Sequence, residues 1–211
     1  MKDTLEFVHE DEFFLVVNKP AKMLSVPGRG PENQDCLISR VQRHFPEALS
    51  VHRLDYATSG LIIVARSKDV HRQLSILFEQ RKIEKSYTAI VSGIIEDDAG
   101  SVDLPLICDW PNRPLQKVDM ETGKPSRTLY QCVERNQANN STRVILTPVT
   151  GRSHQLRVHM QQLGHPILGD QFYAPEPVRN ASPFLCLHAT QLSFTHPVTN
   201  SGIKVVSEPK F

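Results

Sequence analysis

The amino-acid sequence predicts an α+β fold in one domain. Apolar runs at 13–17 and 61–65, rich in aromatic and β-branched residues, are typical of strands, whereas the apolar residues after Ser67 recur at helical spacing. Helices and strands follow one another without a regular βαβ alternation, which favours α+β over a doubly wound α/β fold. The chain has 211 residues, so we expect residues 1–211 to form a single domain.

The first half of the chain carries clear start and stop signals. Pro20 closes the strand at 13–17, because proline lacks a backbone N–H donor and biases the residue before it, Lys19, away from helix. Residues 34–45 have apolar side chains at helical spacing and predict a helix. Ser67 is a suitable N-cap for the amphipathic helix that follows it, and residues 84–93 are typical of a further strand.

The second half alternates between turn-rich and periodic segments. We expect an exposed acidic turn at 96–103, a long structured loop at 104–125 that carries Trp110, and a hairpin formed by 127–135 and 142–148. The other expected elements are a helix over 154–163 ended by Gly164 and closing strands over 187–195 and 203–207.

Composition excludes several protein classes. Hydrophobic residues make up 39% of the chain and charged residues 22%, which is ordinary for a globular protein, and the net charge is only +1. A nucleic-acid surface would therefore have to be a local basic patch. The four cysteines are well separated and form no CxxC pair, which fits reduced thiols. Residues 1–6 contain no leader-like stretch, and the sequence has no apolar run of membrane length. We therefore expect a cytoplasmic protein.

Metal and nucleotide motifs are absent from the sequence. His154 and His159 are five apart, whereas two metal ligands on one helical face need a spacing of four, and no acidic residue lies between them. The tetrapeptide at 52–55 is only faintly similar to the kinase HRD loop, and the chain has no glycine-rich phosphate loop, DFG, GxSxG or dinucleotide fingerprint. We expect no metal and no cofactor.

The stretch 51–60 is the strongest candidate for a site. Arg53 and Asp55 are two residues apart in a turn-rich segment that leads into the apolar run at 61–65, and loops on a rigid scaffold often carry chemistry. A structural Asp–Arg pair that fixes a loop is the alternative. A second donor-rich segment, 151–157, favours a site, because guanidinium groups keep a carboxylate ionised and donors at a helix start suit a phosphate.

The motifs together resemble the RluA-type RNA pseudouridine synthases. The residues that carry the likeness are Val17-Asn18-Lys19-Pro20, His52-Arg53-Leu54-Asp55 with Thr58-Ser59-Gly60, Lys85-Ser86-Tyr87-Thr88-Ala89, Gly151-Arg152-Ser153-His154-Gln155-Leu156-Arg157-Val158-His159, and Gly164-His165-Pro166-Ile167-Leu168-Gly169-Asp170 with Tyr173. Five motifs in one order make a chance match very improbable. The chain differs from the family pattern only in mild exchanges, such as Ser153 for Thr and Leu156 for Ile.

The resemblance implies a fold, an activity and a set of roles. The fold would be α+β, with a long, mixed and mostly antiparallel sheet flanked by helices and loops, and no S4 RNA-binding domain would precede it. Asp55 would be the catalytic aspartate, Arg53 would fill the gap left by the flipped uridine, Tyr87 would pack on the flipped base, and Arg157 would pair with Asp55. Structured RNA would be the only partner.

A narrower likeness concerns residues 104–125, which are similar to the dual-specificity branch of this family. That branch modifies uridine 32 in tRNA anticodon stem-loops and uridine 746 of 23S rRNA. Loop uridines are partly unstacked, which lowers the free-energy cost of flipping the base. Candidate contacts to the RNA backbone are Arg40, Arg43, Arg81, Lys82, Arg113 and Lys117, although a basic cluster at a helix end can equally be a solvated turn favoured by the helix dipole.

Three points stay open at the level of sequence. Asp55 could attack C1′ of the ribose or take a proton from C2′. A non-catalytic RNA-binding or RNA-folding module of the same fold is the alternative function, although the Asp–Arg pair argues against it. A glycosidase-like hydrolase normally needs two carboxylates, and Asp170 is the one motif carboxylate besides Asp55.

Overall fold

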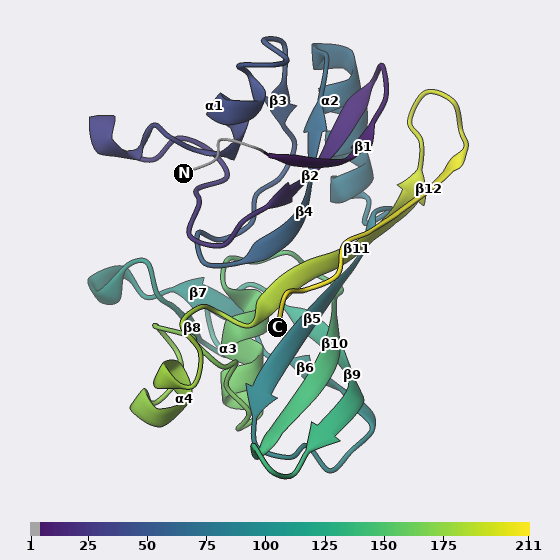
Figure 1. Cartoon of the computed structure of the whole chain (residues 1–211). Coiled ribbons are helices and arrows are strands. Elements are labelled where there is room, and N and C mark those ends of the chain that lie inside the picture. Colours follow the sequence, from purple (N-terminus) through teal and green to yellow (C-terminus); the bar gives the residue numbers. More distant parts are fainter. Residues whose placement is uncertain (1–4) are drawn as a thin grey trace. The chain divides into compact units, whose positions relative to one another are not determined.

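Two sets of strands and helices make up residues 5–211, which are the residues that this computed structural model describes (Figure 1). Contacts divide the chain into unit 1, formed by the described residues through Lys85 together with His188–Lys210, and unit 2, formed by Ser86–Leu187 and Phe211. Residues 1–4 lie outside the described residues, and they include part of the segment 1–6 on which the expectation about a leader rests. Each unit is built around its own strands.

Unit 1 contains a mixed sheet with the strand order β1-β2-β4-β11, in which β3 pairs with β4 and β12 with β11. The bounds are β1 (Glu6–Glu10), β2 (Phe14–Lys19), β3 (Leu49–Ser50), β4 (Ser59–Ala65), β11 (Leu187–Thr195) and β12 (Gly202–Val206). β11 runs parallel to β4, with His188 opposite Ser59, and the other pairs named here are antiparallel.

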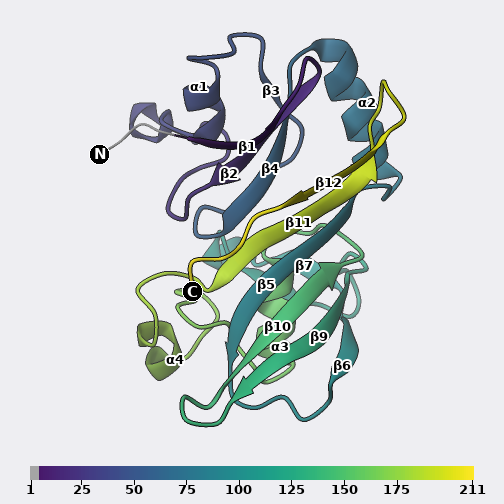
Figure 2. The same ribbon diagram turned by 45° about the vertical axis from the view of Figure 1, so that its right-hand side comes forward.

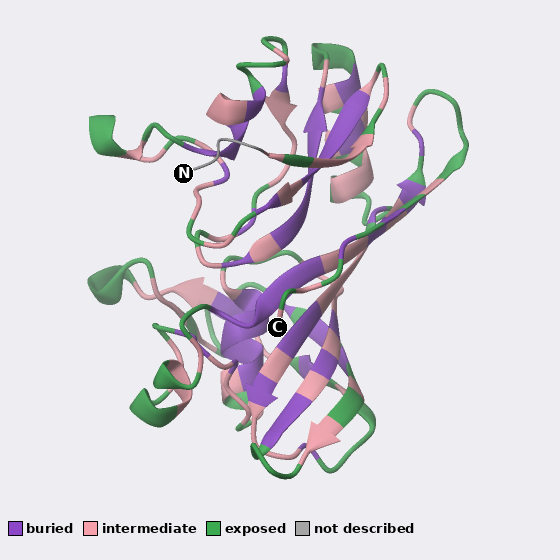
Figure 3. Cartoon of the chain, viewed as in Figure 1, coloured by how far each residue is buried: buried purple, intermediate pink, exposed green. Residues whose placement is uncertain are grey.

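Helices cover both faces of the β2–β4 pair, which explains why these strands are continuously apolar. Phe14, Val16, Leu61 and Ile63 pack on one face with α2 (Lys68–Glu79). The alternate residues of the two strands pack on the other face with α1 (Leu37–Val41). In Figure 3 most of β2 and β4 is accordingly coloured as buried. The strand that follows the Asp55 loop is therefore held rigidly by two core layers.

Unit 2 contains a second run of antiparallel strands in the order β5-β10-β9-β6, which lie side by side in Figure 2. The bounds are β5 (Glu84–Ser92), β6 (Ala99–Asp103), β9 (Arg127–Asn136) and β10 (Ser141–Pro148). A separate hairpin joins β7 (Leu106–Cys108) to β8 (Gln116–Val118) through the 3₁₀ turn Trp110–Asn112. The helices are α3 (Gln155–Gln162) and α4 (Glu176–Asn180).

The α+β prediction is confirmed, with differences in single elements. Ser67 caps α2 by accepting a hydrogen bond from the Val70 amide at 3.3 Å, and Gly164 follows α3 with a φ of +89°, both as predicted. The helix predicted over 34–45 is shorter and spans Leu37–Val41, after which residues 42–44 form turns before Pro46. None of the helices within residues 5–211 is both long and apolar enough to cross a membrane.

Two segments expected to lack regular structure contain strands. The acidic turn predicted at 96–103 is wrong in part, because Ala99–Asp103 forms β6 against β9. Its side chains are mostly exposed, so no apolar pattern marked it. The structured loop predicted at 104–125 contains the β7–β8 hairpin.

Candidate active site

The Asp55 loop of unit 1 is fixed at its centre by a buried serine. The Ser25 hydroxyl donates to the Leu54 carbonyl at 2.7 Å and accepts from the Leu54 amide at 3.0 Å. Leu54 is itself buried, whereas its neighbour Asp55 is half-buried and Arg53 is exposed. The residue between the two charged side chains is thus held at both of its backbone polar groups, which limits how far either charge can move.

His52 anchors the first part of the same loop to β4. Its Nε2 accepts a hydrogen bond from the Ile63 amide at 2.9 Å, and its ring lies 4.5 Å from the ring of Phe78. Burial, together with the positive charge of Lys85, lowers the pKa of His52 to about 3. The imidazole is therefore neutral at physiological pH, and it acts as an acceptor for the strand and not as an acid.

Lys19 anchors the second part of the loop. Its side chain is fully buried, and Nζ donates to the carbonyls of Pro20 at 3.0 Å, Met23 at 2.8 Å and Tyr56 at 3.4 Å. Burial lowers the pKa of Lys19 to about 7, and the negative charge of Asp55 opposes this shift. The Lys19 side chain therefore lies close enough to Asp55 for the two groups to interact electrostatically.

Lys19→Met is expected to change how stability depends on pH. Between pH 7 and 10.5 the unfolded chain holds a proton on Lys19 that the folded chain has lost, so the wild-type free energy of unfolding should rise with pH. The slope from this one proton is at most about 1.4 kcal/mol per pH unit. Urea unfolding of both proteins across this window should show the wild type gaining stability relative to the variant.

An exposed lysine, Lys68, provides the matched control for this comparison, because Lys68→Met removes a charge without emptying a buried site. The Lys68→Met difference should not vary with pH in the same window. A pH-independent difference for Lys19→Met would instead mean that the three carbonyl acceptors keep the ammonium group charged throughout.

Arg157 of unit 2 forms a buried ion pair with Asp170. Nε donates to Oδ2 at 2.8 Å and Nη2 donates to Oδ1 at 2.6 Å, and the side chains are 3% and 0% exposed. Oδ1 of Asp170 also accepts from the amides of Phe172 and Tyr173. The bidentate contact uses two of the five guanidinium N–H donors. Donors therefore remain for the predicted contact of Arg157 with Asp55, which stays a prediction.

Aromatic rings surround the same guanidinium. The Arg157 group lies 5.0 Å from the ring centroid of Phe172 and 5.1 Å from that of Tyr173. The Tyr173 hydroxyl is 2.6 Å from Nδ1 of His154, the residue that precedes α3. Arg157 is therefore held by charge, by hydrogen bonds and by ring faces.

Tyr87, the fourth residue predicted to act on the uridine, is half-buried on β5, in register with Leu146 of β10.

Comparison with known proteins decides the family. A family model described as RNA pseudouridylate synthase matches residues 13–162, more than half of the chain. The chain belongs to this family. It is 53% identical over 207 residues to the dual-specificity RNA pseudouridine synthase RluA of Pasteurella multocida, covering 98% of this chain and 94% of that protein. It is 55% identical over 199 residues to the protein of the same name from Escherichia coli K12, covering 94% and 90%.

Solved structures agree with this assignment. Human RNA pseudouridylate synthase domain containing 1 is 28% identical, with a TM-score of 0.82, and the match covers 99% of this chain and 85% of that chain. Human RNA pseudouridylate synthase domain containing 4 is 27% identical, with a TM-score of 0.76, and the match covers 97% and 89%. The chain is therefore an RNA pseudouridine synthase, an isomerase that acts on uridine in RNA.

The candidate backbone contacts of this synthase fall into different environments. Arg40 is paired with Asp35, with Nε 2.7 Å from Oδ1, so part of its charge is already balanced. Arg113 is exposed and stacks on Trp110. The remaining candidates, all exposed, are Arg43, Arg81, Lys82 and Lys117. Exposure suits a phosphate contact, and Arg40 is the weakest of the six.

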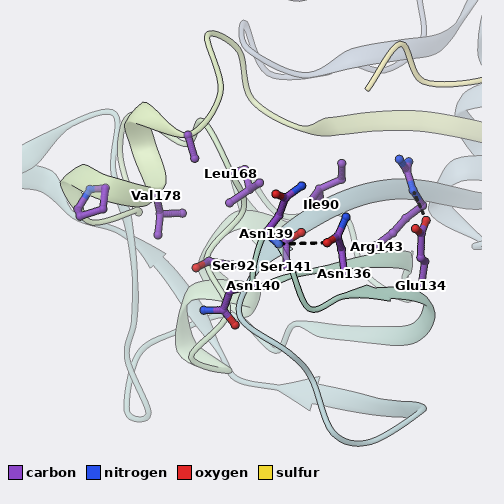
Figure 4. Close-up of a pocket in the computed structure, with 12 residues that line it drawn as sticks. Ile90, Ser92, Glu134, Asn136, Asn139, Asn140, Ser141, Arg143, Leu168 and Val178 are labelled. Carbon is purple, nitrogen blue, oxygen red and sulfur yellow. Dashed lines mark hydrogen bonds and ion pairs between the residues drawn. The ribbon is translucent and has the colours of Figure 1, made fainter.

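A cavity of about 580 Å³ in unit 2 is not the candidate site (Figure 4). Its lining comes mainly from the β9–β10 hairpin, together with β5 and the α4 region, and includes none of the four residues predicted to act on the uridine. Its one carboxylate, Glu134, is exposed and lies 3.8 Å from Nε of Arg143. A solvated ion pair of this kind offers no poised acid or base.

Sequence reasoning missed the buried partners of the site. Nothing in the sequence marked Lys19 as fully buried, or Ser25 as the residue that fixes the loop. The spacing between Arg157 and Asp170 carries no helical signal, because the two residues lie in different segments. From the sequence, Asp170 counts only as a second carboxylate, and its position in the 164–170 motif is the signal that points to a further role.

Proposed function

We propose that this synthase modifies uridine 32 in tRNA anticodon stem-loops and uridine 746 of 23S rRNA. The observation that carries the proposal is the 53% and 55% identity, over nearly the whole chain, to proteins named dual-specificity RNA pseudouridine synthase RluA. The four cysteines are free thiols, which supports the cytoplasm as the place of action.

Asp55 is the catalytic carboxylate in this proposal. The Ser25–Leu54 hydrogen bonds hold its loop in place, and the buried Lys19 side chain lies nearby. An ionised carboxylate can attack C1′ or take the C2′ proton, and either step releases the base from the sugar. The N1–C1′ bond breaks, a C5–C1′ bond forms, and the C5 proton is lost while N1 gains one. Substrate and product are isomers, so atoms balance without an oxidant or reductant.

The other three residues act on the flipped nucleotide. Arg53 is exposed beside Asp55 and is long enough to occupy the gap that the uridine leaves. Tyr87 supplies a ring on which the base stacks, which offsets part of the cost of unstacking. Arg157, held in place by Asp170, supplies guanidinium donors to the Asp55 carboxylate. We propose one catalytic domain that contains all four groups.

Release of tritium tests the activity. Hairpin RNAs that carry the tRNA or the rRNA sequence are labelled with tritium at uridine C5, and the label should appear in water as the new bond to C5 forms. Carbodiimide–alkali treatment and primer extension should then place the product at one uridine of each hairpin. Tight binding of both hairpins without tritium release would support the alternative, a non-catalytic RNA-binding module. Release from only one hairpin would contradict dual specificity.

Tyr87→Phe separates stacking from proton transfer. The variant keeps the ring and removes only the hydroxyl, so if Tyr87 acts by stacking, kcat/KM should stay within about threefold of wild type, whereas Tyr87→Ala should lose at least about tenfold. Tritium release under single-turnover conditions measures both variants. A loss with Tyr87→Phe as large as with Tyr87→Ala would assign the function to the hydroxyl group.

A further inference from the structure

The β7–β8 hairpin carries the only tryptophan of the chain. Trp110 begins the 3₁₀ turn Trp110–Asn112 and is 65% exposed. Single exposed apolar residues are common on proteins, so exposure alone does not indicate a binding site. The surroundings of the Trp110 indole provide the further evidence for a binding site.

A guanidinium covers one face of the ring. The Cζ atom of Arg113 lies 3.3 Å from the ring centroid of Trp110, a close cation–π stack. Because the covered face belongs to Arg113, most of the exposed surface of the ring is the opposite face and the edges. An indole with one face open and a positive charge behind the other can accept a nucleobase by stacking, and the charge attracts the phosphate backbone.

The turn that carries Trp110 is already ordered. The Asp109 amide donates to the Leu115 carbonyl at 2.9 Å, and the Leu115 amide donates to the Asn112 carbonyl at 3.0 Å. The side-chain amide of Asn112 also donates to the Asp109 carboxylate at 2.9 Å. A stacking partner therefore does not have to order the loop first, and preorganisation of this kind raises affinity.

Hydrogen bonds connect the hairpin to Arg157. The Gln116 amide donates to the Tyr173 hydroxyl at 2.8 Å, and the Tyr173 amide donates to the Asp170 carboxylate at 3.2 Å, which also binds Arg157. Trp110 therefore belongs to the same rigid assembly of unit 2 as a residue proposed to act on the uridine. A base stacked on Trp110 would fix the RNA relative to that residue.

The hairpin, residues 106–118, has one more cation than carboxylates, because it contains Arg113 and Lys117 but only Asp109. Arg113, Lys117 and Lys124 are exposed. The carboxylate of Asp109 accepts a hydrogen bond from the Asn112 side chain. The carboxylate of Asp119 accepts hydrogen bonds from the Glu121 and Thr122 amides, and these bonds lower the pKa of Asp119. Glu121 is exposed. The segment 106–124 as a whole is neutral, so the charge that favours RNA is the local one of Arg113 on the ring of Trp110.

We propose that Trp110, backed by Arg113, is a stacking platform for an unpaired base of the RNA hairpin loop other than the uridine that reacts. This inference rests on the proposed function. The platform distinguishes hairpins that present an unpaired base at the required position from paired RNA, because only an unpaired base exposes its face.

The single tryptophan makes a direct test available. A hairpin RNA with an unpaired loop is titrated into the wild-type protein, and a stacked base should quench the indole fluorescence in a saturable manner. A blunt duplex of the same stem should leave the emission nearly unchanged. Trp110→Phe removes the signal and therefore gives the background.

Affinity provides the second readout. Trp110→Ala should weaken hairpin binding by about tenfold, Trp110→Phe should restore it to within about threefold, and neither variant should change binding of the duplex. Val133→Ala, which shortens another exposed apolar side chain, on β9, is the control and should bind both RNAs like wild type. Thermal melting should be unchanged for Trp110→Ala because the ring is largely exposed.

Hairpin affinity of Trp110→Ala within threefold of wild type would overturn the inference, and so would equal quenching by hairpin and duplex. Both outcomes can occur while wild-type protein releases tritium normally. Absence of tritium release by wild type would instead contradict the proposed function, so the two failures are distinguishable.

Discussion

Asp55→Asn is expected to abolish tritium release while RNA binding persists. The amide is nearly the same size as the carboxylate, so the hydrogen bonds of Ser25 to Leu54 and of Lys19 to Tyr56 should hold the loop as before. The amide is uncharged, however, and can neither attack C1′ nor take a proton from C2′ at neutral pH. Loss of an essential nucleophile or base lowers rates by about a thousandfold or more.

The measurement is single-turnover tritium release from saturating hairpin RNA, together with a filter-binding isotherm for the same RNA. Asp69→Asn is the matched control, because Asp69 is an exposed acid of unit 1 in the first turn of α2. It should retain wild-type rate and affinity. Turnover of Asp55→Asn within tenfold of wild type would exclude Asp55 as the catalytic carboxylate. Loss of binding together with turnover would indicate that the loop itself had been disrupted.

The core of unit 1 could be predicted because its signals are local. β2 and β4 are continuously apolar since both faces are covered, and Ser67 caps α2 through its own side chain. β6 could not be predicted in this way. Its ladder partner, β9, lies about 30 residues further along the chain, and its exposed side chains leave no periodic pattern.

The chemistry-bearing loop could be predicted for a different reason. Arg53 and Asp55 lie within one motif, so their proximity is built into the sequence. The groups that hold the loop are distant in sequence and act largely through backbone carbonyls and amides, as Lys19 does at Tyr56 and Ser25 at Leu54. Backbone groups are the same in every residue, so no residue pattern reveals such contacts. Only the fold brings them together.

Asp170→Ala is expected to have the largest effect on stability. It leaves the Arg157 guanidinium buried without its carboxylate and removes the acceptor of the Phe172 and Tyr173 amides. Breaking a buried ion pair by removing one partner typically costs about 3–5 kcal/mol. Urea unfolding should therefore show a midpoint well below that of wild type, with an unchanged m-value if unfolding stays two-state.

A double-mutant cycle separates this pair from simple loss of packing. Arg157→Met should also destabilise strongly, because it leaves the Asp170 carboxylate buried without its guanidinium partner. The double variant, Arg157→Met with Asp170→Ala, contains neither member of the buried pair, so its loss should be smaller than the sum of the two single losses by at least about 1 kcal/mol. Additive losses would mean that the two side chains contribute independently. In that case Asp170 could not be the group that positions Arg157.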